Sequence, residues 1–270
     1  MMKRDLCVAA VMTTSPVGEL DANLAGVARW AARAARQGAE MVCFPELNLT
    51  GYTTREGILA PLAQPIPGPL THGLRAIARE NRITLLAGLA ERGDAGELFA
   101  SHVLMTPQGA CQVYRKIHLA SPEKDLFTPG EGIFVFQAGD IRVGLQLCYD
   151  AHFPEMSTAM ALDGADLIFV AHASPRGTPE DKLTSWMRHL PARAFDNGLF
   201  VVAVNQVGDN GRGLNFPGVA LALGPDGKLL GRTTSPSEEM LVVKLKYARL
   251  RKLRGHPLAY FLPHRRQDLY

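Results

Sequence analysis

The stretch VGLQLCYDAHFPE, residues 143–155, places a cysteine between a strand and a helix. The apolar run before Cys148 predicts a buried strand, and Pro154 suits the first turn of a helix. This order follows the logic of a nucleophile elbow, in which a sharp turn exposes a side chain at the top of a sheet. The stretch therefore predicts a thiol held at the edge of a sheet.

Outward from this segment, short β-branched runs alternate with longer helical stretches, which is typical of an α/β protein. Strands are predicted over 6–12, 41–44, 83–90, 102–105, 111–115, 134–137, 141–147, 166–171, 200–205 and 240–245. Helices are predicted from a cap at Asp21 to Gly38, from Pro69 or Thr71 to Asn81, and over 154–162 and 179–197. Hairpin turns among the crossovers predict a mixed sheet or two packed sheets. We interpret residues 1–270 as one domain.

The composition excludes several classes of protein. A net charge of +3 is small, and its basic excess lies mainly between Lys244 and Arg266. No aromatic residues alternate with these charges, so we expect no nucleic-acid partner. The apolar run at residues 6–12 is too short for a signal-peptide core, and no segment is long enough to span a bilayer. We therefore expect no membrane partner.

The four cysteines show no paired spacing and no metal-ligand pattern, so we expect neither structural disulfides nor a metal site. Free thiols in a chain of this size favour a reducing cytoplasm as its location. Buried cysteines are usually inert, and that interpretation suits Cys7, Cys43 and Cys111. It suits Cys148 poorly because polar residues follow at once. Helix N-terminal N–H groups near Cys148 are expected to favour its thiolate.

Two further polar residues stand where a strand ends. Glu46 follows the strand at 41–44 and Pro45, at an edge where α/β sites usually form. The alternative is a glutamate that caps a helix or forms an ion pair. Lys116 closes the strand at 111–115, where it is either a surface charge or a fixed cation suited to an oxyanion.

Three blocks of sequence, at residues 44–47 (FPEL), 114–119 (YRKIHL) and 147–155 (LCYDAHFPE), resemble the signatures of the nitrilase, or carbon–nitrogen hydrolase, superfamily. The resemblance extends over nearly the whole chain and includes residues 193–197 and 265–270. It implies a four-layer α-β-β-α sandwich with two mixed sheets, in which the glutamate, lysine and cysteine meet.

The resemblance also implies a role for each site residue. Cys148 is the nucleophile, Glu46 the general base and then acid, and Lys116 an oxyanion stabiliser, assisted by the backbone N–H of Tyr149. A second glutamate, Glu123, orients the substrate NH2 group or the attacking water; the alternative is a surface charge on a loop. This chemistry requires neither a metal nor an organic cofactor.

The residues after the nucleophile narrow the substrate class. The order Cys148-Tyr149-Asp150 resembles the amidase and carbamoylase branches, whereas nitrile-hydrolysing members usually carry Cys-Trp-Glu. We expect a small primary amide as substrate, converted to a carboxylic acid and ammonia. The candidate pocket residues are Tyr52, His152, His172, Ser174 and Arg188. For Arg188 an ordinary charge on a helix face is the alternative, and His118 and His172 are expected to bond backbone groups.

Several alternatives stay open. An N-carbamoyl amide hydrolase of the ureidopropionase kind would release carbon dioxide as well as ammonia. Nitrile hydrolysis, a catalytically silent binding protein and a redox-sensing thiol protein are further possibilities. In the family, the C-terminal tail and the helices after the nucleophile build a dimer. We therefore expect residues 256–270 to serve as an oligomerisation tail in a homodimer or a larger homo-oligomer.

Overall fold

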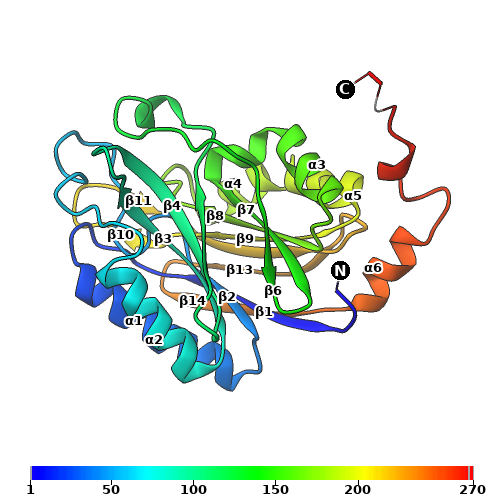
Figure 1. Ribbon diagram of the computed structural model, residues 1–270, viewed down its shortest axis with the longest axis horizontal. Helices are drawn as coiled ribbons and strands as arrows, with labels where there is room; N and C mark the ends of the chain where they lie inside the picture. The colour runs from blue at the N-terminus through cyan, green and yellow to red at the C-terminus, as the bar shows by residue number, and fades with distance from the viewer. Residues whose placement is uncertain (1, 267, 270) are drawn as a thin grey trace.

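A computed structural model describes residues 2–266 and 268–269 and shows two packed sheets with helices outside them (Figure 1). The first sheet has the order β14-β1-β2-β3-β4-β5 and the second β13-β12-β9-β8-β7-β6. The strands are β1 (Leu6–Met12), β2 (Met41–Cys43), β3 (Thr84–Arg92), β4 (Leu98–Met105), β5 (Cys111–Arg115), β6 (Val135–Ala138), β7 (Ile141–Leu147), β8 (Leu167–His172), β9 (Phe200–Asn205), β12 (Gly218–Leu223), β13 (Leu229–Ser235) and β14 (Glu239–Leu245), with β10 (Gly208–Asp209) and β11 (Asn215–Phe216) as a separate pair.

The helices flank these sheets on both outer faces. They are α1 (Leu20–Arg36), α2 (Pro69–Asn81), α3 (Pro154–Leu162), α4 (Pro179–Trp186), α5 (Leu190–Asn197) and α6 (Tyr247–Arg254), with short 3₁₀ turns η1 (Ser121–Glu123), η2 (Cys148–His152) and η3 (Leu262–His264). In Figure 1, α1 and α2 cover the first sheet, and α3 and α5 lie over the second. The α/β class and the four-layer sandwich are confirmed.

Strand β1 shows how the sequence builds two apolar layers. Its side chains alternate between the two faces of the sheet, as in any strand. Leu6, Val8 and Ala10 join the large core between the sheets. Ala9 and Val11 join the core beneath α1 and α2. Both faces are therefore apolar, and the strand is buried on each side.

The sheets are mixed, and several strands run in the same direction toward one end. Strands β1, β2 and β3 pair in parallel, and β4 returns antiparallel so that β5 runs with β3 again. Strands β7, β8 and β9 are also parallel. Glu46, Lys116 and Cys148 follow β2, β5 and β7, and Ser174 follows β8. This end of the sandwich holds the site.

Most of the predicted elements are confirmed within one or two residues, but two predictions are wrong. The helix predicted over 179–197 is two helices, α4 and α5, broken at residues 187–189. Pro191 lies in the first turn of α5, where its missing N–H costs nothing, whereas inside one long helix its ring would clash with the preceding turn. Asp21 is not a cap, because α1 begins at Leu20 and Glu19 occupies the N-cap position.

The C-terminal segment partly packs on the sandwich. Leu262 in η3 is buried in the core between the sheets and the outer helices, whereas Leu258 and Phe261 are exposed. Residues 267 and 270 of the predicted oligomerisation tail lie outside the described residues. The oligomeric role of this segment stays a prediction.

Candidate active site

Glu46 is fully buried in the loop after β2, with 0 % of its surface exposed. Its Oε2 accepts a hydrogen bond of 3.1 Å from the backbone N–H of Ala173, which follows β8 in the other sheet. Its backbone carbonyl accepts a hydrogen bond of 2.8 Å from Nε2 of Gln206. Groups that follow β8 and β9 of the second sheet therefore fix both the carboxylate and the backbone of this first-sheet loop.

Gly88 on β3 lets the Glu46 loop lie this close to the sheet. A Cβ at Gly88 would lie 2.5 Å from the backbone nitrogen of Leu47 and 2.9 Å from Nδ1 of His102. Leu47 itself has a φ of 52°, a left-handed conformation that side chains rarely adopt. Only glycine at position 88 leaves room for this turn.

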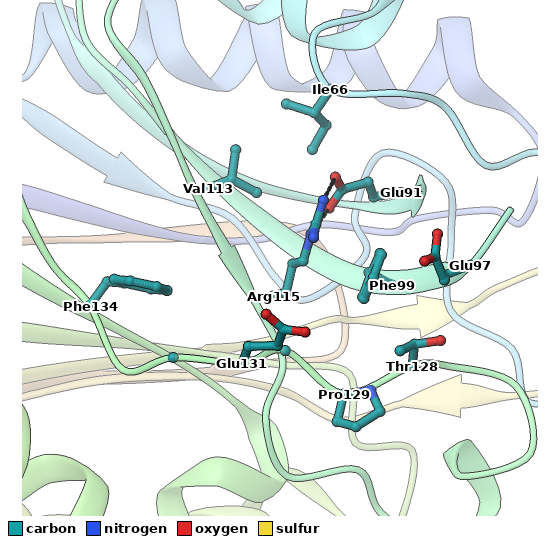
Figure 2. A pocket seen from close by; sticks show the side chains of 12 residues that line it. Ile66, Glu91, Glu97, Phe99, Val113, Arg115, Thr128, Pro129, Glu131 and Phe134 are labelled. Carbon is teal, nitrogen blue, oxygen red and sulfur yellow. Dashed lines mark hydrogen bonds and ion pairs between the residues drawn. The ribbon is translucent and has the colours of Figure 1, made fainter. Parts of the chain in front are cut away.

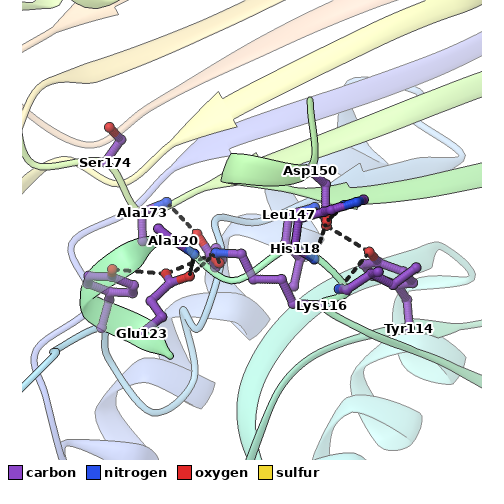
Figure 3. Close-up of polar contacts among 12 residues, drawn as sticks. Tyr114, Lys116, His118, Ala120, Glu123, Leu147, Asp150, Ala173 and Ser174 are labelled. Atoms are coloured by element: carbon purple, nitrogen blue, oxygen red, sulfur yellow. Dashed lines mark hydrogen bonds and ion pairs between the residues drawn. The ribbon is translucent and has the colours of Figure 1, made fainter. Parts of the chain in front are cut away.

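Lys116 lies between two carboxylates at the end of β5 (Figure 3). Its Nζ is 2.7 Å from Oε1 of Glu46, and 2.9 Å and 2.8 Å from the two carboxylate oxygens of Glu123. Only 1 % of Lys116 is exposed, so it is not a surface charge. Burial opposes the charged form, but the carboxylate of Glu46 and its neighbours outweigh burial and raise the pKa of Lys116 above its ordinary value.

Glu123 ends the short turn η1 and is also buried. Its Oε1 accepts a hydrogen bond of 3.0 Å from the hydroxyl of Tyr52, and its Oε2 one of 2.8 Å from the backbone N–H of Ala120. Burial and the nearby charge of Glu123 raise the pKa of Tyr52, so this hydroxyl keeps its proton. Glu123 is thus not a loop surface charge, and Tyr52 supports it.

Cys148 occupies a strained turn between β7 and η2. Its φ is 44°, in the left-handed region that a cysteine seldom enters, as the elbow comparison predicts. The residue is partly exposed, unlike Glu46 and Lys116. The charges of those two residues act on its thiol, which places the three side chains in one site. We call Glu46, Lys116, Glu123 and Cys148 the floor.

Asp150 holds this turn from beneath, a role that the sequence analysis missed. Its Oδ2 accepts hydrogen bonds of 2.9 Å from the backbone N–H of Leu147 and 2.7 Å from the hydroxyl of Tyr114. Its Oδ1 contacts both the backbone N–H and the Nδ1 of His118, each at 2.9 Å (Figure 3). His118 therefore bonds a carboxylate as well as stacking on Phe153, with ring centres 3.8 Å apart. Asp150 lies two residues after the predicted nucleophile, which is the signal that could have found it.

The resting thiol differs from the prediction. Burial, and then the negative charge of Glu46, raise the pKa of Cys148 to about 12, so the thiol rather than the thiolate is the stable form. The expected help from helix N–H groups does not outweigh this environment. Burial also raises the pKa of Glu46, against the lowering effect of Lys116. A base beside Cys148 is therefore needed to remove its proton.

The remaining pocket candidates lie around the floor at different depths. Ser174 directly follows Ala173 and is half-buried, and its backbone N–H donates to Oδ1 of Asn205 at 2.9 Å. His172 is buried against Trp186, and within the described residues its Nε2 has no hydrogen-bond partner. His152 and Arg188 are exposed.

Lys182 on α4 is a second site cation that the sequence analysis missed. It is 9 % exposed, and its Nζ donates a hydrogen bond of 2.5 Å to the hydroxyl of Ser174. Burial lowers its pKa, and its charge acts on Cys148. A lysine one helical turn before Trp186, on the apolar face of a helix, is the signal that could have found it.

A separate groove of about 400 Å³ lies beside β5 (Figure 2). Arg115 points into it, whereas the next residue, Lys116, points to the floor. The guanidinium of Arg115 forms hydrogen bonds of 2.9 Å and 2.6 Å with the carboxylate of Glu91 and packs over the ring of Phe99. These groups satisfy one another, and the groove contains no residue of the floor.

Within residues 2–266 and 268–269, no group of three or more His, Cys, Asp or Glu side chains is arranged to hold a metal ion. None of the helices in this part of the chain is both long and apolar enough to cross a membrane.

Residues 7–255 match the family model described as carbon-nitrogen hydrolase. The chain belongs to the carbon–nitrogen hydrolase family. It is similar to a protein from Pyrococcus abyssi named nitrilase, with 36 % identity over 97 % of this chain and 98 % of that one. It is also similar to an (R)-stereoselective amidase from a Pseudomonas species, with 35 % identity over 71 % and 68 %.

Among solved structures, NitN, an amidase of the nitrilase superfamily from Nesterenkonia sp. AN1, has a TM-score of 0.82 and 31 % identity. The match covers 98 % of both chains. The superfamily resemblance drawn from the three sequence blocks is therefore confirmed, and the sandwich is that of solved relatives.

Proposed function

We propose that this chain hydrolyses small primary amides to carboxylic acids and ammonia through a thioester on Cys148. The observation that carries the proposal is the floor itself, in which one ammonium is held by two buried carboxylates beside a cysteine on a strained turn. In support, a mutant of the similar Nesterenkonia amidase shows covalent addition of the acetamide moiety of fluoroacetamide at its active-site cysteine.

In the first half-reaction, the Glu46 carboxylate removes the thiol proton as Sγ of Cys148 bonds to the amide carbonyl carbon. Lys116 has three N–H donors, and its two carboxylate partners leave one for the oxyanion that forms. The backbone N–H of Tyr149 is the second oxyanion donor. The C–N bond then breaks, and Glu46 returns its proton to the nitrogen, which leaves as ammonia.

In the second half-reaction, water replaces ammonia. Glu46 removes a proton from the water as its oxygen bonds to the thioester carbon, and the C–S bond then breaks. The thiolate of Cys148 regains the proton, and the carboxylic acid leaves. Glu123 and Tyr52 keep Lys116 in place throughout, because Tyr52 donates to the same carboxylate oxygen that Lys116 contacts.

The test measures ammonia release from a panel of primary amides, N-carbamoyl amines and nitriles, and carbon dioxide release in parallel. We expect ammonia without carbon dioxide from amides, and a thioester adduct on the intact protein by mass spectrometry after brief mixing. Cys148→Ala should lose at least about 10⁴-fold in kcat and form no adduct, since removal of a nucleophile costs this much in other hydrolases.

Cys111→Ala is the matched control, because Cys111 is a partly exposed thiol outside the floor. It should keep full activity. If the enzyme hydrolysed only the N-carbamoyl compounds, with release of carbon dioxide, its function would be that of a carbamoylase and not of an amidase. Amide hydrolysis that survives in Cys148→Ala would overturn the mechanism.

A further inference from the structure

Lys182 is a cation buried without a counter-ion. Its one hydrogen bond is the donation to Ser174, and no carboxylate of residues 2–266 or 268–269 lies within ion-pairing distance of its Nζ. Besides Cys148, the charged group that acts on it is another cation, Arg176. An ammonium has three donors, so donor capacity remains for another partner.

Such an arrangement is costly for the free protein. A buried charge normally has an opposite charge beside it, as Lys116 does, and an unpaired one loses hydration without compensation. Burial accordingly lowers the pKa of Lys182. An anionic ligand that binds here would supply the missing charge.

Lys182 also lies next to the floor. Ser174, which accepts its hydrogen bond, follows Ala173, and Ala173 donates to Glu46 (Figure 3). The charge of Lys182 also acts on Cys148, so this cation lies close to the place where the carbonyl carbon of a bound amide would meet the thiol. Without Lys182, the two carboxylates of the floor would repel a negatively charged substrate.

A second, independent observation comes from His172. Only 3 % of this residue is exposed, and its Nε2 is buried with no hydrogen-bond partner among the described residues. Its ring packs at a tilt against that of Trp186, which lies one helical turn after Lys182, with ring centres 4.3 Å apart. Lys182, Ser174 and His172 thus offer a ligand a cation, a hydroxyl and an imidazole nitrogen that has no hydrogen-bond partner.

We propose that Lys182, with Ser174 and His172, binds a carboxylate at the far end of the substrate, so that the preferred substrates are monoamides of dicarboxylic acids. This rests on the proposed function, because the amide end occupies the floor. A single ammonium with neutral partners suits one negative charge, whereas a phosphate dianion usually recruits arginines or several cations.

The test compares each monoamide of succinic, glutaric and adipic acid with a neutral counterpart in which a methyl ketone replaces the carboxylate. For the best chain length, we expect the wild type to prefer the carboxylate by at least about tenfold in kcat/KM. Lys182→Met should reduce this preference by about 10- to 100-fold, mainly through KM, as expected for a lost hydrogen bond to a charged group.

Lys182→Arg should keep much of the preference, because the charge remains. Lys228→Met, which removes an exposed lysine on the β12–β13 hairpin, should leave it unchanged. An unaltered preference in Lys182→Met, or equal losses on charged and neutral amides, overturns the proposal, since Lys182 would then act on the floor or on the fold.

A binding measurement separates this proposal from the proposed function. Titration calorimetry of glutaramate with Cys148→Ala and with Cys148→Ala/Lys182→Met needs no turnover. At least tenfold weaker binding to the double variant supports the carboxylate site even if the wild type hydrolyses no amide. Equal binding to both variants, or no binding to either, refutes it.

Discussion

The two buried lysines of the site differ in what surrounds them. Lys116 lies between the carboxylates of Glu46 and Glu123, and its charge is more than balanced. Lys182 has one hydroxyl and no carboxylate within the described part of the chain. Lys116 has opposite charges beside it when no substrate is bound, whereas Lys182 has none. The difference separates a group that belongs to the reaction from one that selects what enters.

The largest effect is expected from removing Lys116, the lysine whose charge is balanced by two carboxylates. Lys116→Met leaves two carboxylates buried against each other, and breaking a buried ion pair on one side typically costs about 3–5 kcal/mol of unfolding free energy. The variant also loses an oxyanion donor, which lowers kcat by about 100- to 1,000-fold. Urea denaturation and amide kinetics measure the two effects. A stability loss below about 1 kcal/mol would show that the carboxylates do not depend on Lys116.

The pH dependence of activity tests the protonation state of Glu46, the proposed base of the floor. Burial raises the pKa of Glu46 from 4.5 to about 7, and the base must be the carboxylate. For a neutral amide, kcat/KM should therefore fall about tenfold per pH unit below about 7, or roughly 100-fold by pH 5. A pH–rate profile measures this. If the midpoint of the acid limb lay near pH 4.5, Glu46 would not have the raised pKa that follows from its burial.

Stability should change in the opposite direction over the same range. Since the pKa of Glu46 is higher in the folded chain than its ordinary 4.5, its contribution to stability is full below that value and is lost as the pH rises through about 7. Denaturation of Glu46→Gln at several pH values checks the sign. The variant should lack this part of the pH slope.

The smallest effect concerns Lys182, and its sign is the informative part. Lys182→Met removes an unpaired buried charge, so we expect a gain of about 0.5–1 kcal/mol in unfolding free energy, or a Tm higher by about 1–4 °C. Natural sites often keep such a stability cost for function. Thermal denaturation without ligand measures the change, with Lys228→Met as the control. A loss of stability would mean that the fold itself needs this ammonium.

Much of the fold and floor could be predicted because the signals are local in the sequence. Glu46, Lys116 and Cys148 each follow an apolar strand, and the carboxyl ends of parallel strands share an edge. Pro191 also carried a local signal, but the apolar pattern was extended across it and gave one helix instead of two.

Other properties depend on burial that only the assembled layers create. The high pKa of the Cys148 thiol arises from residues far away in the chain, so the local helix N–H groups were a misleading guide. In the sequence, Lys182 resembles an ordinary charge on a helix face. It is buried only because α4 packs against β12 and β13. Asp150 acts through Tyr114, which precedes it by 36 residues.

The sandwich has a further consequence for the reaction. Glu46 and Lys116 extend from loops of the first sheet, whereas Cys148 extends from the second. The gap between base and nucleophile is therefore set by the thickness of the apolar filling between the sheets, which includes Val8 and Leu145. Because catalysis is sensitive to displacements of about 1 Å, enlarging or trimming one of these distant methyl groups should alter turnover as well as folding.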